Sequence, residues 1–343
     1  RSIIGAQSLI NAQIENKVVA LRNGTMGWHL AGFALEHGAD RRAEDVTIDQ
    51  LRSAMNAAAE VANAAGVTTI GAAEYARWLG ERNKRTMYIL DVRSPEEFAL
   101  GHLFEARCAP GGQLVQAAGR WIGIRNARVV LVDDTGVRAK MTAAWLLQMG
   151  YPNVAVLEDA FCDRDLLPGP ETKPQQQHQA CRWTEPDALR TLLESDLATV
   201  IDFGRSKTYR DRHIPGAWFA IRSRLKHALP RIDLKPQVIL TSDEPAVAVL
   251  AAPEVEEVIG RPVSVLRGGN AAWSGAGFAL EAGSDRMCDD AIDEWYAPYD
   301  LAYGVEDAMK DYLGWEIDLV EGVRSEGDLN FNLSPAPSLH FEV

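Results

Sequence analysis

The chain has 343 residues, of which 47% are hydrophobic and 24% are charged, and its formal net charge is −13. This length is enough for two or three domains, and the composition is that of a soluble globular protein. An acidic surface repels phosphate backbones, and no apolar run reaches the roughly 20 residues that cross a bilayer. We therefore expect neither nucleic acid nor a membrane as a partner.

The cysteine pattern argues against a metal site and against a disulfide framework. No Cys-x-x-Cys pair occurs among Cys108, Cys162, Cys181 and Cys288, and their spacing suits neither a zinc site nor a small stapled domain. We predict no metal, no cofactor and a cytoplasmic location, where thiols stay reduced. The first residues have no signal-peptide pattern and no initiator Met, so we expect a fragment or a processed product.

The first predicted elements read as the end of a domain. The stretch "VVALRNGTMGWHLAG" at 18–32 reappears as "VSVLRGGNAAWSGAG" at 263–277, with matching residues such as Trp28 and Trp273 separated by 245 positions. A helical pattern, "SIIGAQSLINAQ", precedes the strand-like "KVVALR". So short a segment cannot hold the start of a domain. We predict that residues 1–41 are the last third of a repeated domain, named copy 1 here.

A second repeat follows. "DVRSPEEFALGHLFEA" at 91–106 aligns with "DFGRSKTYRDRHIPGA" at 202–217, with matching residues 111 positions apart. A β-rich run precedes each segment and two further apolar runs follow each, alternating with helical patterns such as 138–150. A period near 110 indicates whole domains, copies 2 and 3. Short apolar strands alternating with helices predict, in each copy, a small parallel sheet with helices on both faces.

The connecting segments complete the predicted organisation. Residues 46–66 read as a helix that begins with a capping box of Thr47 and Gln50, and 305–323 reads as an amphipathic helix with an acidic polar side. The Pro- and Gln-rich 167–180 reads as a linker. The predicted divisions are 1–41 (truncated copy 1), 42–66 (linker helix), 67–165 (copy 2), 166–182 (linker), 183–285 (copy 3) and 286–343 (C-terminal helical tail).

The turn after "VVLV" is the candidate site in copy 2. Ligands of open parallel sheets bind beyond the carboxyl ends of strands. There, backbone N–H groups of the Gly-containing loop from Asp133 to Arg138 could form an anion cradle, with Arg138 adding donors. The same residues suit a plain strand-to-helix turn capped by Asp133 or Asp134. The residues alone leave both interpretations open.

The order of these motifs resembles the rhodanese family of sulfurtransferases. The closing signature is "VLRGGNAAW", and the opening signature is carried by Asp91, Arg93, Glu97, Phe98, Gly101 and His102. The resemblance covers nearly all of residues 1–285 and implies an α/β protein of tandem rhodanese-like domains. It also implies a loop of the form Cys-x-x-Gly-x-Arg. In the family, that Cys takes sulfur from a thiosulfate-like donor as a persulfide and passes it to cyanide or a thiol. A protein acceptor stays open.

Both complete copies depart from the family at the loop. In copy 2 the Cys position holds Asp133, although Gly136 and Arg138 match. In copy 3 the position holds Ser242, and neither the Gly nor the Arg is matched. Neither a carboxylate nor a hydroxyl can carry a persulfide. We predict that both copies are non-catalytic, that His102 and His213 are structural, and that the four cysteines do not replace the nucleophile.

Copy 1 is the exception. Arg1 and Ser2 stand where the loop's last Arg and the first helix residue belong, so the resemblance implies a reactive Cys just upstream of Arg1. The leading hypothesis is a thiosulfate sulfurtransferase of which this C-terminal part alone is inactive. The alternative is an inert rhodanese-like scaffold or binding module. A phosphatase is disfavoured, because Asp133 and Arg138 enclose four residues and the related phosphatases need five.

Overall fold

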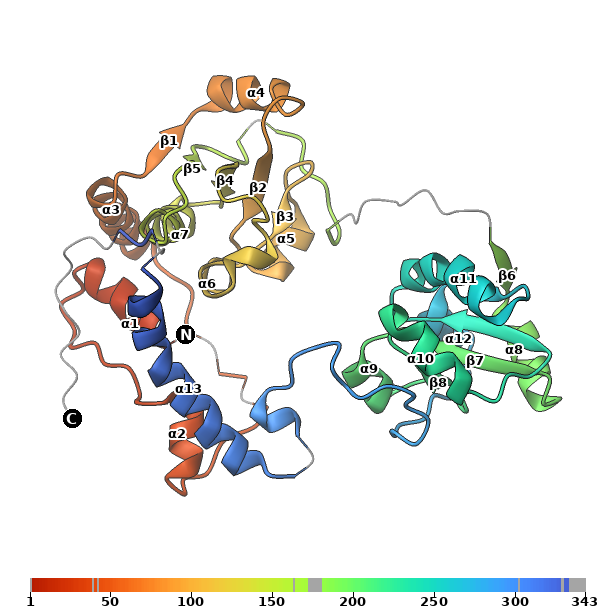
Figure 1. Ribbon diagram of the computed structural model, residues 1–343. Helices are drawn as coiled ribbons and strands as arrows, with labels where there is room; N and C mark the ends of the chain where they lie inside the picture. The colour runs from red at the N-terminus through yellow and green to blue at the C-terminus, as the bar shows by residue number, and fades with distance from the viewer. Residues whose placement is uncertain are drawn as a thin grey trace. The chain divides into compact units, whose positions relative to one another are not determined.

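The computed structural model describes residues 2–38, 40–41, 43–162, 164–171, 181–301, 303–327 and 330–332. The chain forms two compact units. One unit comprises Arg1–Lys173 together with Gly304–Val343, and the other is Pro174–Tyr303. The C-terminal segment therefore returns to the first unit, which the sequence did not predict (Figure 1).

The first unit contains a five-stranded sheet in the order β1-β5-β4-β2-β3, and every pair is parallel. Successive residues of a strand point to opposite faces. On β4, Leu131 packs into one hydrophobic cluster and Val130 into another, and every residue of this strand is buried. Helices thus cover both faces. The strands are β1 (Thr68–Ile70), β2 (Met87–Asp91), β3 (Arg107–Cys108), β4 (Arg128–Val132) and β5 (Val154–Leu157). The helices are α3 (Ile48–Ala64), α4 (Ala72–Gly80), α5 (Pro95–Leu100), α6 (Gly111–Gln116) and α7 (Val137–Gln148).

The second unit repeats the plan, with the parallel strand order β6-β10-β9-β7-β8. This confirms the predicted α/β class with tandem parallel sheets. Its strands are β6 (Arg182–Thr184), β7 (Ala198–Asp202), β8 (Trp218–Phe219), β9 (Gln237–Thr241) and β10 (Ser264–Leu266). Its helices are α8 (Pro186–Glu194), α9 (Ser206–Asp211), α10 (Leu225–Ala228), α11 (Pro245–Ile259) and α12 (Gly269–Gly275). Short 3-10 turns lie at Ala118–Arg120, Arg222–Arg224, Leu229–Arg231 and Pro298–Asp300.

The chain before copy 2 has the same closing turn as copy 3. It contains α1 (Ser2–Asn11) and α2 (Gly24–Leu30). The indole N–H of Trp28 donates to the carbonyl of Ala34 at 2.9 Å, and that of Trp273 donates to Ala279 at 2.9 Å. The two donors are 245 residues apart, and so are the two acceptors, as in the sequence repeat.

The strand predicted at 17–22 is wrong: the structure has no strand there. Its counterpart β10 lies between β6 and β9 and bonds to both. A strand forms through ladder hydrogen bonds to neighbouring strands, and copy 1 has no sheet among the described residues. The chain from Lys17 to Leu21 therefore runs without regular structure.

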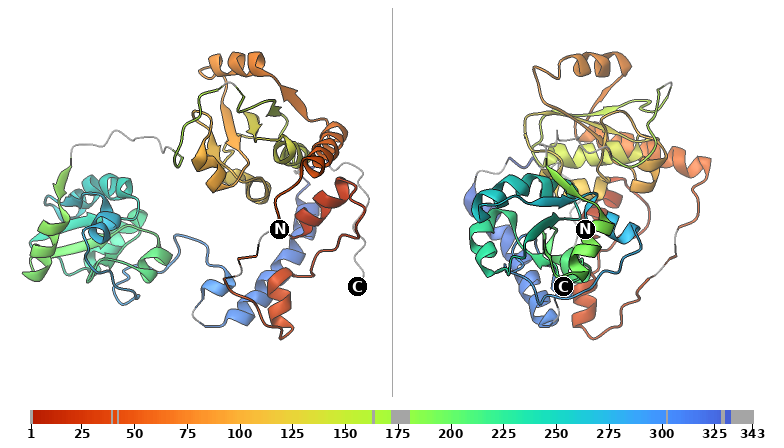
Figure 2. Two further views of the ribbon diagram at one scale, coloured as in Figure 1. Left: turned by 180° about the vertical axis from the view of Figure 1, so that it is seen from behind. Right: turned by 90° about the vertical axis from the view of Figure 1, so that its right-hand side faces the viewer.

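The connecting helices form as predicted, with one difference in role. The capping box of α3 is present, since Thr47 and Gln50 each accept the other's backbone N–H. Instead of standing free as a linker, α3 packs against α7 and buries Ala58 and Ala62. The last helix among the described residues, α13 (Val305–Glu326), runs beside α2 (Figures 1 and 2), and at its start a carboxylate oxygen of Glu306 lies 3.8 Å from Nε2 of His29 on α2.

Candidate functional site

The loop of copy 2 connects the carboxyl end of β4 to the start of α7. Asp133 is buried, and its carboxylate accepts the backbone N–H groups of Gly136 at 2.8 Å and Arg138 at 2.9 Å. Burial raises the pKa of Asp133, and these backbone hydrogen bonds act in the opposite direction. The turn thus combines the two interpretations, an anion cradle and a capped turn. Its backbone N–H groups converge on one point, and the carboxylate of Asp133 occupies that point.

The Arg138 guanidinium is already paired. It donates to Glu97 through two hydrogen bonds of 2.7 and 2.9 Å and to Asp134 at 2.9 Å. The bonds from Arg138 lower the pKa of Glu97 to about 2, and Glu97 in turn raises the pKa of Arg138. Glu97 also closes the capping box of α5 with Ser94. Arg138 therefore ties the loop to α5.

In copy 2, residues of the opening signature hold the end of β2 and the end of α5 together. Arg93 donates to the buried Asp91 at 2.7 Å and to the carbonyl of Gly101 at 2.6 Å. His102 is buried, stacks on Phe98 at 3.8 Å between ring centroids and bonds through Nδ1 to the Phe98 carbonyl.

The same histidine contacts recur in copy 3. His213 stacks on Tyr209 at 3.9 Å between ring centroids, and its Nδ1 lies 2.6 Å from the Tyr209 carbonyl oxygen. Both histidines thus make the same local contacts at equivalent positions. Such contacts suit the structural role expected of them.

The loop of copy 3 is closed. Ser242 is buried, and its hydroxyl accepts the N–H of Glu244 at 3.1 Å, just before α11 begins. Gly269 of the closing signature lies against this loop at φ +61°, and a Cβ there would meet the Ser242 carbonyl oxygen at 2.2 Å. Only glycine fits that approach. The Ser242 side chain is thus closed off from solvent.

Copy 3 has also lost the arginine that pairs with the buried aspartate. The position of Arg93 is taken by Gly204, whose N–H donates to Asp202 at 2.7 Å. Asn270 donates to the other carboxylate oxygen of Asp202 at 2.8 Å. Burial raises the pKa of Asp202 to about 6. The site is therefore rebuilt around neutral donors.

Three of the four cysteines, Cys108, Cys181 and Cys288, have a raised pKa. Burial raises the pKa of Cys108 and Cys181, and raises that of Cys288 to about 11. Cys162 lies exposed in a turn beyond β5. A reactive Cys needs the opposite shift, from a helix amino end or nearby cations.

The helix that follows the predicted loop of copy 1 packs against copy 2. Arg1 lies outside the described residues, and Ser2 is the first residue of α1. The indole N–H of Trp145 on α7 donates to the Ser8 hydroxyl at 2.9 Å. A cavity of about 480 Å³ next to this contact is lined by α1, α6 and α7 and reaches Arg138. The sequence analysis did not predict this contact, although Trp145 belongs to the apolar face of the helical pattern at 138–150.

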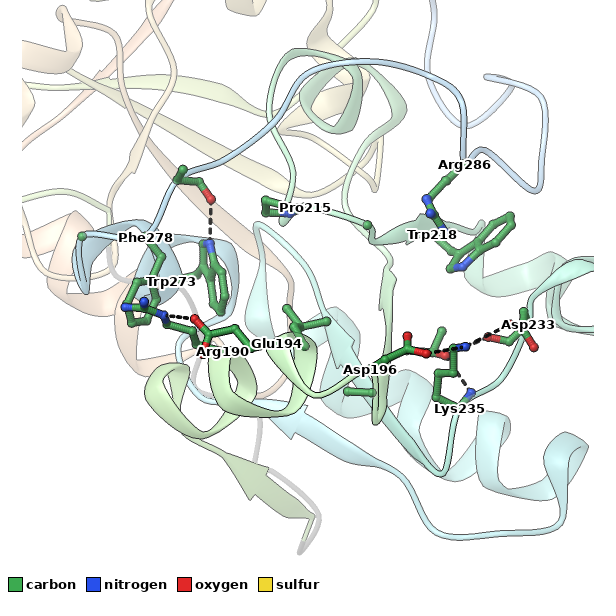
Figure 3. Close-up of a pocket in the computed structure, with 16 residues that line it drawn as sticks. Arg190, Glu194, Asp196, Pro215, Trp218, Asp233, Lys235, Trp273, Phe278 and Arg286 are labelled. Atoms are coloured by element: carbon green, nitrogen blue, oxygen red, sulfur yellow. Dashed lines mark hydrogen bonds and ion pairs between the residues drawn. The ribbon is translucent and has the colours of Figure 1, made fainter.

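Another cavity, of about 690 Å³, lies in the second unit (Figure 3). Its walls include Trp218, Trp273 and Phe278, and Arg286 lies over the Trp218 ring. It reaches Ala198, the first residue of β7. The Ser242 loop follows the carboxyl end of β9, which is the parallel neighbour of β7. The cavity thus reaches the amino end of β7, whereas the loop lies at the carboxyl ends of these strands. It is separate from the loop site.

No helix among the described residues is long and apolar enough to span a membrane. Across the same residues, no group of three or more His, Cys, Asp or Glu side chains is arranged to hold a metal ion.

Comparison with known proteins identifies what the chain is similar to. The family model "Rhodanese-like domain" matches residues 72–162. The crystal structure of thiosulfate sulfurtransferase from Pseudomonas aeruginosa is 42% identical with a TM-score of 0.91, and the match covers 97% of this chain and 63% of that one. The chain thus spans less than two thirds of that relative's length. The Alr3790 protein from Anabaena sp. is 24% identical over 29% of this chain and 82% of that one, with a TM-score of 0.27. No curated protein matches the chain.

Proposed function

Because this chain belongs to the rhodanese-like family of sulfurtransferases, we propose that it is part of a thiosulfate sulfurtransferase whose reactive Cys lies upstream of Arg1. The present chain supplies the last third of the catalytic copy, with α1 and α2, and two complete copies that do not react. The domain divisions 1–41, 67–165 and 183–285 belong to this proposal. The Pseudomonas relative is itself a thiosulfate sulfurtransferase.

The observation that carries the proposal is the match between α1 and α7. Gln13 donates its N–H to the Ile10 carbonyl as Gly150 does to Leu147, and both have positive φ, of 55° and 81°. Gln13 and Gly150 are 137 residues apart, and so are Arg1 and Arg138. The match supports Arg1 as the last residue of a family loop. Because Asp133 lies five residues before Arg138, the nucleophile would lie five residues before Arg1.

The apolar residues at the end of copy 1 support the truncated domain. Leu21 is 50% exposed and Trp28 is 40% exposed, whereas their counterparts Leu266 and Trp273 are 0% and 5% exposed. Leu266 and Trp273 belong to one core cluster. Apart from these two residues, the cluster members that lie after residue 245 are Phe278, Leu280 and Met287, and all the others lie before residue 246. With a separation of 245, their counterparts in copy 1 would precede residue 1.

The proposed chemistry needs one thiolate. Loop N–H groups and the amino end of α1 would lower the pKa of that Cys. The thiolate attacks the outer sulfur of thiosulfate, a new S–S bond forms, and sulfite leaves with the electron pair of the broken bond. Cyanide or an acceptor thiolate then attacks the outer sulfur of the persulfide, and the Cys thiolate leaves. Copies 2 and 3 take no part, because Asp133 fills its own cradle and Ser242 is buried.

The test is a thiosulfate-to-cyanide transfer assay on the protein that includes the residues before Arg1. We expect activity that is lost when the Cys five residues before Arg1 is changed to Ala, and no activity from residues 1–343 alone. The alternative is an inert scaffold, favoured by the missing nucleophile in both complete copies. An Asp or Ser five residues before Arg1, with no transfer, would establish that alternative.

A further inference from the structure

The cavity of about 690 Å³ in the second unit has the size of a small-molecule site, and the proposed sulfur chemistry makes no use of it. Its walls carry three aromatic rings (Figure 3). Trp218 lies on β8, Trp273 lies in α12, and Phe278 follows just after that helix. The ring centroids of Trp273 and Phe278 are 4.8 Å apart. Such side chains supply flat apolar surface on which a planar ring can stack.

Two arginines of the wall lie over these rings. Cζ of Arg190 is 5.1 Å from the Phe278 ring centroid, and Cζ of Arg286 is 5.2 Å from the Trp218 ring centroid. Arg190 is already paired, because its Nε donates to Glu194 at 2.8 Å. In the described part of the chain, the Arg286 guanidinium makes no ion pair and no hydrogen bond. Its N–H groups are therefore available to a ligand.

The indole N–H of Trp218 is a second available donor. Trp273 donates its indole N–H to the Ala279 carbonyl at 2.9 Å, whereas that of Trp218 has no acceptor among the residues that the structure describes. Figure 3 shows Trp218 and Arg286 side by side. An indole and a guanidinium can donate hydrogen bonds but cannot accept them. A group that meets both must be an acceptor, and a negatively charged acceptor bonds an arginine most strongly.

The other charges of the wall indicate how such a ligand would be oriented. Lys235 is shared by two carboxylates, since its Nζ lies 3.1 Å from Asp196 and 3.4 Å from Asp233. In Figure 3 this group lies apart from Arg286. One cation between two carboxylates leaves that end of the cavity negative. A ligand anion would be repelled there and attracted to Arg286.

The aromatic wall belongs to copy 3. In copy 2 the position of Trp218, 111 residues earlier, holds Arg107, which donates to Glu171 at 2.9 Å. Copy 3 has also lost the Gly and the Arg of the family loop. The cavity reaches the amino end of β7, far along the strand from the loop. A domain with a closed loop and a separate aromatic cavity is suited to binding.

We propose that this cavity binds a small aromatic acid, that is, a planar ring that carries a carboxylate. The ring stacks on the aromatic wall, and the carboxylate accepts hydrogen bonds from the Arg286 guanidinium and the Trp218 indole N–H. The inference goes beyond the proposed function and needs no reactive Cys, because all these residues belong to the second unit.

The test is a titration of the 343-residue chain with three probes. Indole-3-acetate has both a ring and a charge, indole-3-acetamide lacks the charge, and acetate lacks the ring. Binding is followed by the indole N–H signals in ¹H–¹⁵N NMR spectra, in which Trp218→Phe identifies the Trp218 signal. We expect indole-3-acetate to shift that signal and to bind at least about tenfold more tightly than either of the other probes.

Arg286→Gln should weaken the binding of indole-3-acetate to the level of the amide. This variant should fold, because the Arg286 side chain is exposed. Arg267→Gln is the matched control. Arg267 also lies over a tryptophan, 4.8 Å from the Trp183 ring centroid, but it is not part of the cavity wall and donates to Glu185 at 2.6 Å. Its replacement should leave the affinity unchanged.

Three results would overturn the proposal. The first is equal affinity for indole-3-acetate and its amide, and the second is unchanged affinity in Arg286→Gln. The third is a Trp218 signal that does not move with up to about 10 mM indole-3-acetate. The proposed function is tested separately, because binding here is expected whether or not the longer protein transfers sulfur.

Discussion

The Arg138 guanidinium and the Glu97 carboxylate face each other through two hydrogen bonds, of 2.7 and 2.9 Å. The pair joins the loop after β4 to the first turn of α5. In copy 3 the two positions hold Val247 and Thr208, so both partners are replaced together. The start of α9 is capped there instead by Asp293 and Glu294, which accept the N–H groups of Ser206 and Lys207. The arginine at the end of the copy 2 loop thus has a structural use, since it ties the loop to α5.

The variant Glu97→Gln tests whether the hydrogen bonds between Arg138 and Glu97 stabilise the fold. Glu97 has a lowered pKa of about 2, so its charge stabilises the fold above the unfolded-state pKa of about 4.3 and this contribution is lost as the pH falls through 2. Because the side chain is 36% exposed, solvent screens the pair, and we expect a loss of roughly 0.5–1 kcal/mol at pH 7. Urea denaturation at pH 7 and pH 3 should show a difference that shrinks at the lower pH. Glu60→Gln, on the exposed side of α3, should change neither midpoint.

Asp133→Cys tests whether the loop of copy 2 is still an anion cradle. The N–H groups of Gly136 and Arg138 now bond the carboxylate, and they should stabilise a thiolate in its place. We expect alkylation of the new thiol, followed by peptide mass spectrometry, to have a midpoint below the free-thiol value of about 8.5. The matched variant Ser242→Cys should keep a midpoint at or above the free-thiol value, since the Ser242 hydroxyl accepts the backbone N–H of Glu244 alone and the position is buried. A midpoint above the free-thiol value at position 133 would show that the cradle is lost.

The two closing turns give a matched pair of tryptophans. Trp273 is buried in the core of the second unit, so Trp273→Ala should cost about 3–5 kcal/mol of unfolding free energy. Trp28→Ala in residues 1–343 should cost about 1 kcal/mol or less, because the ring is 40% exposed. Native-state hydrogen exchange of α2 and α12 measures the two separately. Equal costs would mean that copy 1 has a core of its own in this chain.

Asp202 should make the second unit less stable as the pH rises. Its folded pKa is raised to about 6 from an ordinary value of 3.8, so the folded state holds the proton more tightly. The stabilisation is complete below about pH 4 and is lost as the pH rises through 6. Asp202→Asn should flatten this decline in urea midpoint. Asp196→Asn, at an 82% exposed side chain, should retain it.

The sequence predicted the fold because its signals are local and repeated. The buried strand β4 carries the continuous apolar run Val129–Val132, and Thr47 and Gln50 encode the start of α3 directly. The strand predicted at 17–22 failed because a strand depends on neighbours, and the pattern of Val18 and Val19 says nothing about whether those neighbours are present.

The site was predictable in position but not in its contacts. The motif located Asp133 and Arg138, yet the pairing of Arg138 with Glu97 joins residues 41 apart, and that of Trp145 with Ser8 joins residues 137 apart. Such contacts depend on how elements pack in three dimensions, which a spacing rule does not contain. The return of α13 to the first unit was missed for the same reason.

The central claim is that sulfur is carried by a Cys before Arg1 and not by any residue of this chain. The most direct measurement is peptide mass spectrometry of the longer protein after incubation with thiosulfate and again after cyanide. The account predicts one added sulfur atom on the Cys five residues before Arg1, removed by cyanide, and none on Cys108, Cys162, Cys181 or Cys288. Sulfur on one of those four, or on no residue at all, would contradict it.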